Sequence, residues 1–411
     1  MADITTLDRA SVRPDHCRFY LSQPHGMLWS ILNPEPAAMR PATTAVLSSL
    51  VLTACADTAA TLEPQVNSRI TATEITSGLN HPWSLAFVSD DEWLITERRG
   101  TLQRVVEGEL QDTPVDGVPK VVASGQGGLF DVLPHPDFAQ NQRLYLSYAK
   151  PCGDEGGTTA VGYGTYKAGT LSDFRAVYVA EKSCTNTAKH FGGRILFDND
   201  GYLFLTIGDR GERERAQNTQ DPAGSVVRLH DDGRIPEDNP LVGQADKATE
   251  IWSWGHRNPQ GLTLHPQTGS PWLNEHGPRG GDEINAVKPG INYGWPVITY
   301  GREYYGPGIG DTEKQGYAQP LLHWTPSIAP AGMAFITSDR YPGWRGHTAN
   351  GALKLQHLNL VAFDGEKPVS ETRLLGDREQ RIRDVRQGPD GYLYLLTDSN
   401  DGQLLKLNPA E

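Results

Sequence analysis

The sequence feature that most limits the possible folds is a strand–turn–strand phrase that recurs along the chain from residue 81 onward. Each copy has an apolar strand, a tight turn, and a second apolar strand that ends in an acidic or Gly-rich turn. In two copies the turn is Asp200-Gly201 or Asp390-Gly391, a strong short-range signal for a β-hairpin. The six copies begin at His81, Gly127, Gly193, Gln260, Ala331 and Arg383.

The spacing of these copies predicts the fold. Intervals of roughly 45 to 70 residues fit an array with one small sheet per repeat. Such sheets bury their faces only against neighbours, so the array must close into a ring. We therefore predict an all-β fold, a six-bladed β-propeller over residues 70–408, in which the final strand at 403–407 pairs with an early strand. A pair of β-sandwiches is the structural alternative. Residues 346–351 are polar where an apolar inner strand is expected, which predicts an irregular fifth blade.

Composition supports this class of fold and excludes one class of partner. The 44 Gly and 29 Pro are spread along the chain, which favours many short elements joined by tight turns. The formal net charge is -13 and no run of Lys and Arg is present, whereas a phosphate-binding surface needs clustered cations. We therefore expect no nucleic-acid partner.

The segment before the repeats has the pattern of an export signal. Met39 is followed by one positive charge, a short apolar stretch and small residues before Cys55. Residues 52–55, Leu-Thr-Ala-Cys, resemble a bacterial lipobox, and the stretch is shorter than the about 20 residues that span a bilayer. We expect a lipoprotein signal peptide at 39–55 and a flexible tether at 56–69.

Two further expectations concern the same region. Residues 1–38 resemble neither a signal nor a blade, and we interpret them as a non-native or disordered extension before a start at Met39. By resemblance to lipoproteins, Ala56 after the lipidated Cys permits sorting to the outer membrane. The predicted location is the periplasm, with a lipid anchor in the outer membrane.

Two cysteines lie within the repeats, Cys152 and Cys184. Export makes a disulfide between them chemically reasonable, and closing a loop of about 30 residues would contribute roughly 3 kcal/mol. Two free surface thiols are the alternative.

Uncommon polar phrases occur at the junctions of the predicted blades, which in a propeller point toward one end of the central channel. They are Lys-His-Phe-Gly-Gly-Arg at 189–194, Gly-Asp-Arg-Gly at 208–211, Gly-His-Arg-Asn-Pro-Gln-Gly at 255–261, Asn-Glu-His-Gly-Pro at 274–278, Gly-Asp-Glu-Ile-Asn at 281–285, Asn-Tyr-Gly-Trp-Pro at 292–296 and Arg-Ile-Arg-Asp at 381–384. Together these phrases resemble the soluble glucose and aldose sugar dehydrogenases that use pyrroloquinoline quinone. The resemblance runs from about residue 81 to residue 407.

The resemblance implies a cofactor site. Pyrroloquinoline quinone is a flat quinone with three carboxylates, so its pocket needs cations and planar guanidinium groups. Arg381 and Arg383 alternate in a predicted strand and so share a face. An exposed Arg pair or a lone Lys is more often only a solvated charge. The implied cofactor-binding residues are Gln126, His190, Arg257, Asn258, Lys354, Arg381 and Arg383.

The resemblance also implies a reaction, the oxidation of an aldose at C1 to its lactone. A hydroxyl proton is removed while a hydride leaves to the quinone, and a neutral imidazole suits that proton transfer near pH 7. We predict His190 as the general base, Asp209 as the carboxylate that orients its ring, and Arg257 as a catalytic group at the quinone carbonyls. Electrons would pass to a respiratory or artificial acceptor.

Calcium is the metal that the resemblance implies. It would polarise the quinone carbonyl as a Lewis acid, and it requires oxygen ligands. The implied ligands are the carbonyls of Gly277 and Pro278 and, for a further ion, Glu283 and the Tyr293 carbonyl. The sequence contains no EF-hand spacing, so these assignments depend on the resemblance.

Two other functions remain open at this point. A calcium-dependent propeller lactonase or related hydrolase would also place carboxylates and a His around the channel, but it would not need Arg257, Arg381 and Arg383. A non-catalytic binding propeller would have no affinity for a quinone. The sequence does not identify the sugar.

Overall fold

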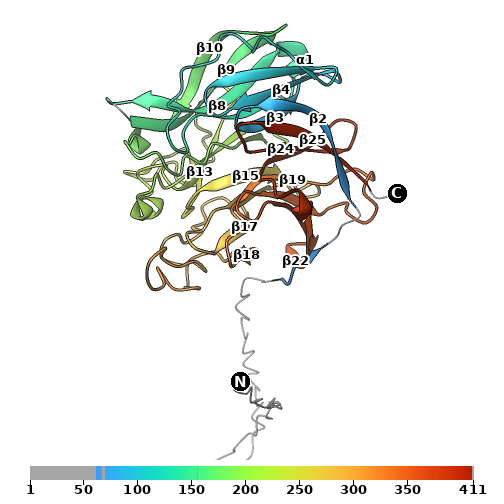
Figure 1. The fold of residues 1–411 in the computed structure, drawn as a ribbon. Coiled ribbons are helices and arrows are strands. Elements are labelled where there is room, and N and C mark those ends of the chain that lie inside the picture. The colour runs from blue at the N-terminus through green and yellow to red at the C-terminus, as the bar shows by residue number, and fades with distance from the viewer. Residues whose placement is uncertain (1–61, 67–69, 155, 410–411) are drawn as a thin grey trace, which may run out of the picture. The chain divides into compact units, whose positions relative to one another are not determined.

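The computed structural model describes residues 62–66, 70–154 and 156–409, and it confirms the predicted all-β class. Its strands form six sheets arranged as the blades of a six-bladed β-propeller (Figure 1). The predicted extension at 1–38 and signal peptide at 39–55 lie outside the described residues. Within the described part, none of the helices has the length and apolar character needed to cross a bilayer.

The first three blades follow the order of the chain. Blade one consists of β3 (Pro82–Phe87), β4 (Glu92–Glu97), β5 (Thr101–Val106) and β6 (Glu109–Leu110). Blade two consists of β7 (Leu129–Pro134), β8 (Arg143–Cys152), β9 (Gly156–Lys167) and β10 (Thr170–Val179), with helix α1 (Phe138–Asn141) after β7. Blade three consists of β11 (Ile195–Phe197), β12 (Leu203–Ile207), β13 (Ser225–Leu229) and β14 (Ile251–Trp254). Two 3-10 turns, η1 (Glu181–Ser183) and η2 (Arg213–Gln217), lie in the connections.

Of the other three blades, the fifth and the sixth include a strand from the start of the described chain. Blade four consists of β15 (Pro259–Leu264), β16 (Pro271–Glu275), β17 (Asp282–Ala286) and β18 (Leu322–Trp324). Blade five consists of β19 (Pro330–Phe335), β20 (Thr348–Ala352), β21 (His357–Asp364), β22 (Lys367–Leu374) and β1 (Gln65–Val66). Blade six consists of β23 (Ile382–Gln387), β24 (Leu393–Thr397), β25 (Gly402–Asn408) and β2 (Thr71–Leu79), preceded by the 3-10 turn η3 (Gly376–Arg378).

The two ends of the described chain close the ring. Strand β2 runs antiparallel to β25, with Thr71 opposite Asn408 and Thr73 opposite Lys406. In Figure 1 the blue β2 accordingly lies beside the dark red β25. The prediction that the final strand pairs with an early one is confirmed.

Part of the expected tether is a strand. Gln65 and Val66 pair in parallel with Thr372 and Arg373 of β22, and Leu62 packs against the core of the neighbouring blades. The structure therefore differs from the predicted flexible tether at these positions, because the edge of β22 offers unpaired backbone groups that a strand can satisfy.

The fifth blade contains a regular, buried strand over 348–352 where an irregular one was expected, so that expectation is wrong. Every residue of β20 is buried, and the strand pairs continuously with β21 from Thr348 to Ala352. The polar side chain of Asn350 in this strand is hydrogen-bonded. Its Nδ2 donates to Thr348 Oγ1 at 3.1 Å, and its Oδ1 accepts from Asn274 Nδ2 at 2.9 Å. Polar groups that are hydrogen-bonded in this way can be buried without a large cost.

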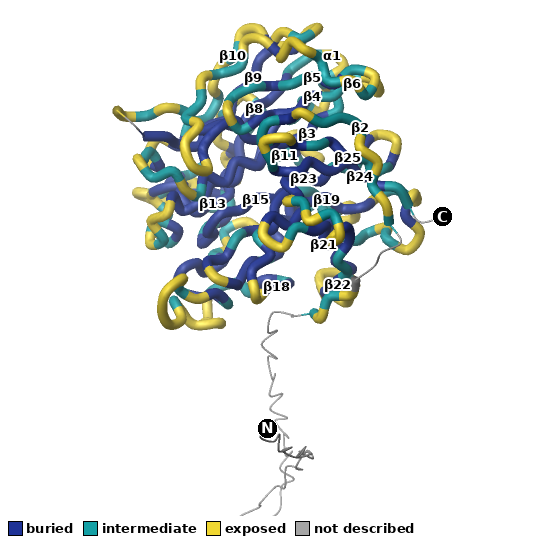
Figure 2. Tube along the Cα trace, in the orientation of Figure 1, coloured by how far each residue is buried: buried dark blue, intermediate teal, exposed yellow. Residues whose placement is uncertain are grey.

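Apolar side chains between adjacent blades form the core, as the dark blue inner strands in Figure 2 show. One cluster includes Leu358 of blade five and Leu395 of blade six, and another includes Leu404 of blade six and Leu85 of blade one. Blade six is thus packed on both sides, which is the physical requirement for a closed ring.

The predicted disulfide is present. Cys152 at the end of β8 is bonded to Cys184 just after η1, with a sequence separation of 32 residues and Cα atoms 6.1 Å apart. It ties the end of β8 to the segment that leads to His190.

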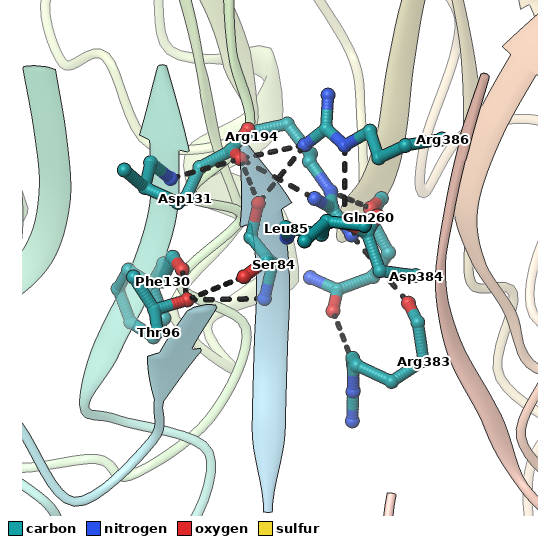
Figure 3. Close-up of polar contacts among 12 residues, drawn as sticks. Ser84, Leu85, Thr96, Phe130, Asp131, Arg194, Gln260, Arg383, Asp384 and Arg386 are labelled. Carbon is teal, nitrogen blue, oxygen red and sulfur yellow. Dashed lines mark hydrogen bonds and ion pairs between the residues drawn. The ribbon is translucent and has the colours of Figure 1, made fainter. Parts of the chain in front are cut away.

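A set of four charged side chains, three buried and one half-buried, joins three blades (Figure 3). We call Asp131, Arg194, Asp384 and Arg386 the central quartet. Asp131 Oδ1 accepts from Arg386 Nη2 at 2.6 Å and lies 3.5 Å from Arg194 Nη1. Asp384 lies 2.8 Å from Arg194 Nη2 and 3.0 Å from Arg386 Nε. Two cations and two carboxylates therefore alternate.

The central quartet adjoins the cavity described below. Arg194 Nε donates to the carbonyl of Gln260 at 2.7 Å, and its guanidinium carbon lies 4.1 Å from the centre of the Trp83 ring. Gln260 and Trp83 both line that cavity. The quartet thus fixes the positions of two of its walls.

Candidate active site

A cavity of about 190 Å³ lies near the channel axis, between the inner ends of several blades. Its lining combines three guanidinium groups, three side-chain amides and three aromatic rings. The lining residues are Trp83, Arg98, Gln126, Phe130, Phe191, Gly192, Asn258, Gln260, His276, Ala329, Leu353, Arg381 and Arg383. Four of the predicted cofactor-binding residues, Gln126, Asn258, Arg381 and Arg383, thus share one cavity.

The predicted base lies beside this cavity. His190 precedes the lining residues Phe191 and Gly192, and its Nδ1 is 2.6 Å from Asp209 Oδ1. An ionised carboxylate can only accept, so Nδ1 carries the proton in this contact and Nε2 is left as a proton acceptor. The predicted pairing of His190 and Asp209 is present in the structure.

The local backbone holds His190 in an unusual conformation. Its φ is +51°, in the left-handed region, and its N–H donates to Gln126 Oε1 at 2.7 Å. Close packing from the neighbouring strand adds a second constraint, because a Cβ at Gly208 would lie 2.2 Å from the His190 carbonyl oxygen. Backbone strain of this kind persists only where the surroundings enforce it, and it is common at active sites.

The electrostatics of the pair favour a neutral imidazole and an ionised carboxylate. Burial lowers the pKa of His190; the hydrogen bond to Asp209 partly offsets this, and the charge of Arg257 lowers the pKa further. Burial tends to raise the pKa of Asp209, but the His190 hydrogen bond and the Arg257 charge outweigh it and lower that pKa. Asp209 is also fixed by Trp295 Nε1, which donates to its Oδ2 at 2.8 Å.

Arg257 and Asn258 lie at the start of blade four, close to His190. The backbone N–H of Asp209 donates to the Arg257 carbonyl at 2.9 Å, and Asn258 Oδ1 accepts from the Gly192 N–H at 3.2 Å. Arg257 Nη1 donates to the carbonyl of Gly277 at 2.8 Å, while its buried Nε finds no partner among the described residues. A buried donor without a partner fits a residue that completes its hydrogen bonds with a ligand.

Two further arginines share one carboxylate. Arg381 Nη2 lies 2.8 Å and Arg383 Nη2 lies 3.2 Å from Asp398 Oδ2, and His81 Nδ1 lies 2.7 Å from Asp398 Oδ1. Burial raises the pKa of Asp398, but the charge of Arg383 and the hydrogen bonds from Arg381 and His81 hold it well below its usual range. With Arg98 also in the lining, the cavity has a surplus of positive charge.

Three of the seven predicted cofactor residues do not line this cavity: His190 and Arg257 precede lining residues in the chain, and Lys354 lies in a different hollow. Lys354 is exposed and lines a neighbouring hollow with Arg279 and Arg302. Leu353, one residue earlier, lines the cavity instead. The structure therefore does not bring Lys354 together with the other predicted residues.

Several residues that line the cavity were absent from the predicted site. Trp83 comes from blade one, and Gln260 accepts from Arg383 Nη1 at 3.2 Å. His276 Nε2 donates to the Pro330 carbonyl at 2.6 Å, and burial lowers the pKa of this His to about 3, so it is neutral at pH 7. Gln260 belongs to the same phrase at 255–261 as Arg257 and Asn258, and this is the signal that could have found it.

Two carboxylates face each other beside the cavity. Glu283 of β17 is opposite Glu275 of β16, and Asn285 Nδ2 donates to both, at 3.0 Å and 3.2 Å. Burial raises the pKa of Glu283 well above its usual range, and the charge of Glu275 adds to this. The buried Asn285 Oδ1 has no hydrogen-bond partner among the described residues. This set of oxygens suits a hard cation such as calcium.

The other predicted calcium ligands lie nearby. The Gly277 carbonyl accepts from Arg257, and Pro278 follows in the loop between β16 and β17. The Tyr293 hydroxyl donates to the Ala286 carbonyl, and its ring stacks on His256 with centroids 4.8 Å apart. Among the residues that the structure describes, no group of three or more His, Cys, Asp or Glu side chains is arranged to hold a metal. A metal site here would therefore need carbonyl or amide oxygens in addition to one or two carboxylates.

The six-bladed propeller has a cation-rich cavity and an adjoining His–Asp pair. These features are typical of propeller enzymes that act on a small ligand near the channel. The chain belongs to the glucose/sorbosone dehydrogenase family, whose family model matches residues 79–406. It is therefore an oxidoreductase.

Individual relatives agree with this family. The chain is 47% identical over 337 residues to aldose sugar dehydrogenase YliI of Escherichia coli, covering 80% of this chain and 91% of that protein. It is similar to the crystal structure of the soluble aldose sugar dehydrogenase from Escherichia coli in the apo-form, with a TM-score of 0.80, 45% identity, and coverage of 82% and 99%. It is also similar to the PQQ-bound form of aldose sugar dehydrogenase from Streptomyces coelicolor, with a TM-score of 0.70, 26% identity, and coverage of 84% and 99%.

Proposed function

We propose that this protein oxidises aldose sugars at C1 to the corresponding lactones, with pyrroloquinoline quinone as cofactor. The observation that carries the proposal is the surplus of guanidinium groups and amides in a partly aromatic cavity, next to a His whose ring nitrogen faces away from its carboxylate partner. A flat, multiply anionic molecule fits such a lining.

The cofactor would be held by four residues that line the cavity. Arg381 and Arg383 supply guanidinium groups for carboxylates, and Gln126 and Asn258 supply amides for carbonyl oxygens. Arg257, with its unpartnered Nε, lies within the same group. When bound, pyrroloquinoline quinone supplies a two-electron acceptor for the hydride that leaves C1.

His190 acts on the proton. Its Nε2 takes the proton of the C1 hydroxyl, so that the C1–O bond gains double-bond character as the hydride departs. Asp209 holds the ring in the required tautomer and stabilises the imidazolium that forms. The lowered pKa of His190 keeps the imidazole neutral before the reaction at pH 7.

Calcium is part of the proposal. Glu283, Glu275 and Asn285 offer oxygens for one ion, and the Gly277, Pro278 and Tyr293 carbonyls are further candidates by family resemblance. A divalent cation would relieve the repulsion between the buried Glu275 and the half-buried Glu283, and this is the reason to expect it there.

Location and electron acceptor also remain proposals. The export pattern at 39–55 supports a periplasmic protein that is lipid-anchored to the outer membrane. The electrons would then pass to a respiratory acceptor, for which a redox dye can substitute in an assay.

The test is dye reduction by the purified protein with added pyrroloquinoline quinone, calcium and a panel of aldoses. We expect sugar-dependent reduction that needs both additions and that falls about a thousandfold in His190→Ala, since a general base contributes about 10²- to 10⁴-fold. His230→Ala, which changes a His outside the cavity, is the matched control.

A separate titration of pyrroloquinoline quinone, followed by its absorbance, distinguishes the possible failures. Binding without turnover would point to an untested sugar. Absence of binding would sink the quinone assignment, and hydrolysis of a lactone by the same protein would then favour the lactonase.

A further inference from the structure

Arg210, in the turn after β12, is a buried cation that the proposed reaction does not use. Its side chain is fully buried, and among the described residues it forms no salt bridge. The two carboxylates nearest in the chain, Asp209 and Glu212, pair with His190 and with another arginine. Burial lowers the pKa of Arg210 to about 9, so the group remains protonated at pH 7. A buried charge without a carboxylate partner destabilises a fold, so its position needs another explanation.

The guanidinium group of Arg210 is bound by main-chain carbonyls around the proposed base. Its Nη1 donates to the carbonyl of Lys189, and its Nη2 donates to the carbonyls of Thr187 and Gly157, both at 3.1 Å. Thr187 and Lys189 lie three residues and one residue before His190, whereas Gly157 belongs to β9 of blade two. Arg210 therefore ties the segment that carries the base to a neighbouring blade.

The same side chain supports a wall of the cofactor cavity. Its guanidinium carbon lies 3.4 Å from the centre of the ring of Phe191, which lines the cavity and directly follows His190. The turn is held in return, because Thr187 Oγ1 donates to the Arg210 carbonyl at 2.5 Å. Arg210 itself does not line the cavity. It thus contacts the residues on both sides of the base without reaching the place of the cofactor.

Two side chains hold the backbone of this segment. Gln126, which lines the cavity, accepts from the His190 N–H at 2.7 Å, and its own N–H donates to the Ala188 carbonyl at 2.9 Å. Arg210 binds the carbonyls at 187 and 189. The φ of His190 is +51°, a conformation that a residue other than glycine keeps only where its surroundings enforce it. Arg210 is part of those surroundings.

We infer that Arg210 is a positioning residue for the oxidation, which fixes the backbone of residues 187–190 so that the His190 imidazole stays at the C1 hydroxyl of the sugar. The inference rests on the proposed role of His190 as the general base. A guanidinium group suits this task because its planar fork reaches several carbonyls and stacks on a ring, whereas an ammonium group is a compact point charge. A displacement of about 1 Å at a catalytic group can cost about 100-fold in rate.

Arg210→Lys tests the fork, because it keeps the charge and loses the planar geometry. We expect kcat for an oxidised aldose to fall about 10- to 100-fold, with KM and the affinity for pyrroloquinoline quinone changed less than about threefold, since the residues proposed to bind the cofactor are intact. Arg228→Lys is the matched control and should leave kcat unchanged. Arg228 is also buried, its guanidinium carbon lies 3.7 Å from the centre of the Tyr202 ring, and it does not line the cavity.

Arg210→Gln tests the charge through the pH profile. Burial lowers the pKa of His190, and the hydrogen bond to Asp209 partly offsets this. The charges of Arg257 and Arg210 lower the same pKa further, while the nearby His276 is neutral at pH 7. Loss of the Arg210 charge therefore raises the His190 pKa, so the rising limb of kcat/KM should move to higher pH in Arg210→Gln and stay in place in Arg210→Lys. A purely structural role would move the limb in neither variant.

A measurement that needs no turnover tests the segment directly. The His190 and Gly192 N–H groups donate to side-chain oxygens, which protect them from exchange with solvent. In protein without added cofactor, we expect amide hydrogen exchange in peptides covering 187–192 to be about tenfold faster in Arg210→Lys and Arg210→Gln, because local opening becomes easier. Exchange of the same peptides should not change in Arg228→Lys.

The outcomes separate this inference from the proposed function. Turnover that falls in His190→Ala and in neither Arg210 variant would overturn the inference and leave the proposed function intact. A fall in kcat that Arg228→Lys shares would assign the loss to general destabilisation and likewise overturn it. Exchange at the unaltered protein's rate in both Arg210 variants would overturn the inference whether or not the protein oxidises a sugar. No oxidation of any sugar by the unaltered protein would instead refute the proposed function, and the role given to Arg210 with it.

Discussion

The central quartet and the cofactor cavity use the same residue types in opposite ways. In the quartet, two arginines meet two aspartates, and each carboxylate contacts both guanidinium groups. In the cavity, Arg381 and Arg383 share Asp398, and Arg98 adds a third cation. Balanced charge can stay buried without a ligand, whereas surplus charge needs an anion from outside. The difference separates the residues that hold the ring from those that would hold the cofactor.

The largest expected effect comes from breaking the balance of the quartet. Asp131→Ala leaves Arg386 without its closest partner and Arg194 with one carboxylate fewer, and breaking a buried pair in this way costs about 3 to 5 kcal/mol. Chemical denaturation of the purified protein measures this change in the free energy of unfolding. Asp339→Ala, at an exposed ion pair, is the control and should cost less than about 1 kcal/mol. A loss as small as the control's would mean that the quartet does not hold the blades together.

A smaller effect, of a different kind, is expected in the cavity. Arg383→Gln removes surplus charge, so we expect affinity for pyrroloquinoline quinone to fall about 10- to 100-fold, as for loss of a hydrogen bond to a charged group. The free energy of unfolding should fall by less than in Asp131→Ala, because Arg381 and His81 still pair with Asp398 and no buried carboxylate loses all its partners. Cofactor titration and denaturation on the same preparation check both statements. A large loss of stability with normal cofactor affinity would erase the distinction between the two regions.

The smallest expected effect is a shift in pH dependence. The hydrogen bond from His190 to Asp209 raises the pKa of the imidazole, although burial lowers that pKa overall. The base must be neutral to accept a proton, so kcat/KM rises as the pH increases through the His190 pKa. This rising limb of the pH–rate profile should lie below pH 6.5, because the His190 pKa is lowered from that value. In Asp209→Asn the raising contribution is lost, and the limb should move to still lower pH. Rates measured from acid to neutral pH test this, and a limb that moved upward would contradict the assigned pairing.

Much of the fold was predictable because hairpin turns are local. Asp200-Gly201 and Asp390-Gly391 each join two strands that pair directly, β11 with β12 and β23 with β24. Closure by β25 was also predictable, since a ring of sheets requires it. The strand at β20 was not, because burial of Asn350 depends on a partner, Asn274, in another blade.

The candidate site was predictable only in part, for a related reason. The family phrases identified His190, Asp209 and the Arg pair, and the structure brings these into contact or into one cavity. Asp398 and the central quartet were not identified. Asp131 and Arg386, for example, are 255 positions apart, and no spacing in the sequence relates them. Lys354, in contrast, was included in the predicted site but does not line the cavity; its neighbour Leu353 does.

The closure of the ring by β2 and β25 also affects how the protein is made. Thr73 and Asn408, whose side chains are hydrogen-bonded at 2.8 Å, are 335 positions apart. At about 5 to 20 residues per second, roughly 17 to 67 seconds pass after the synthesis of β2 before its partner strand exists. Throughout synthesis the chain therefore carries an unpaired strand edge, which is a template for aggregation. That exposure ends only when the seven residues of β25, Gly402–Asn408, have been made and have paired with β2.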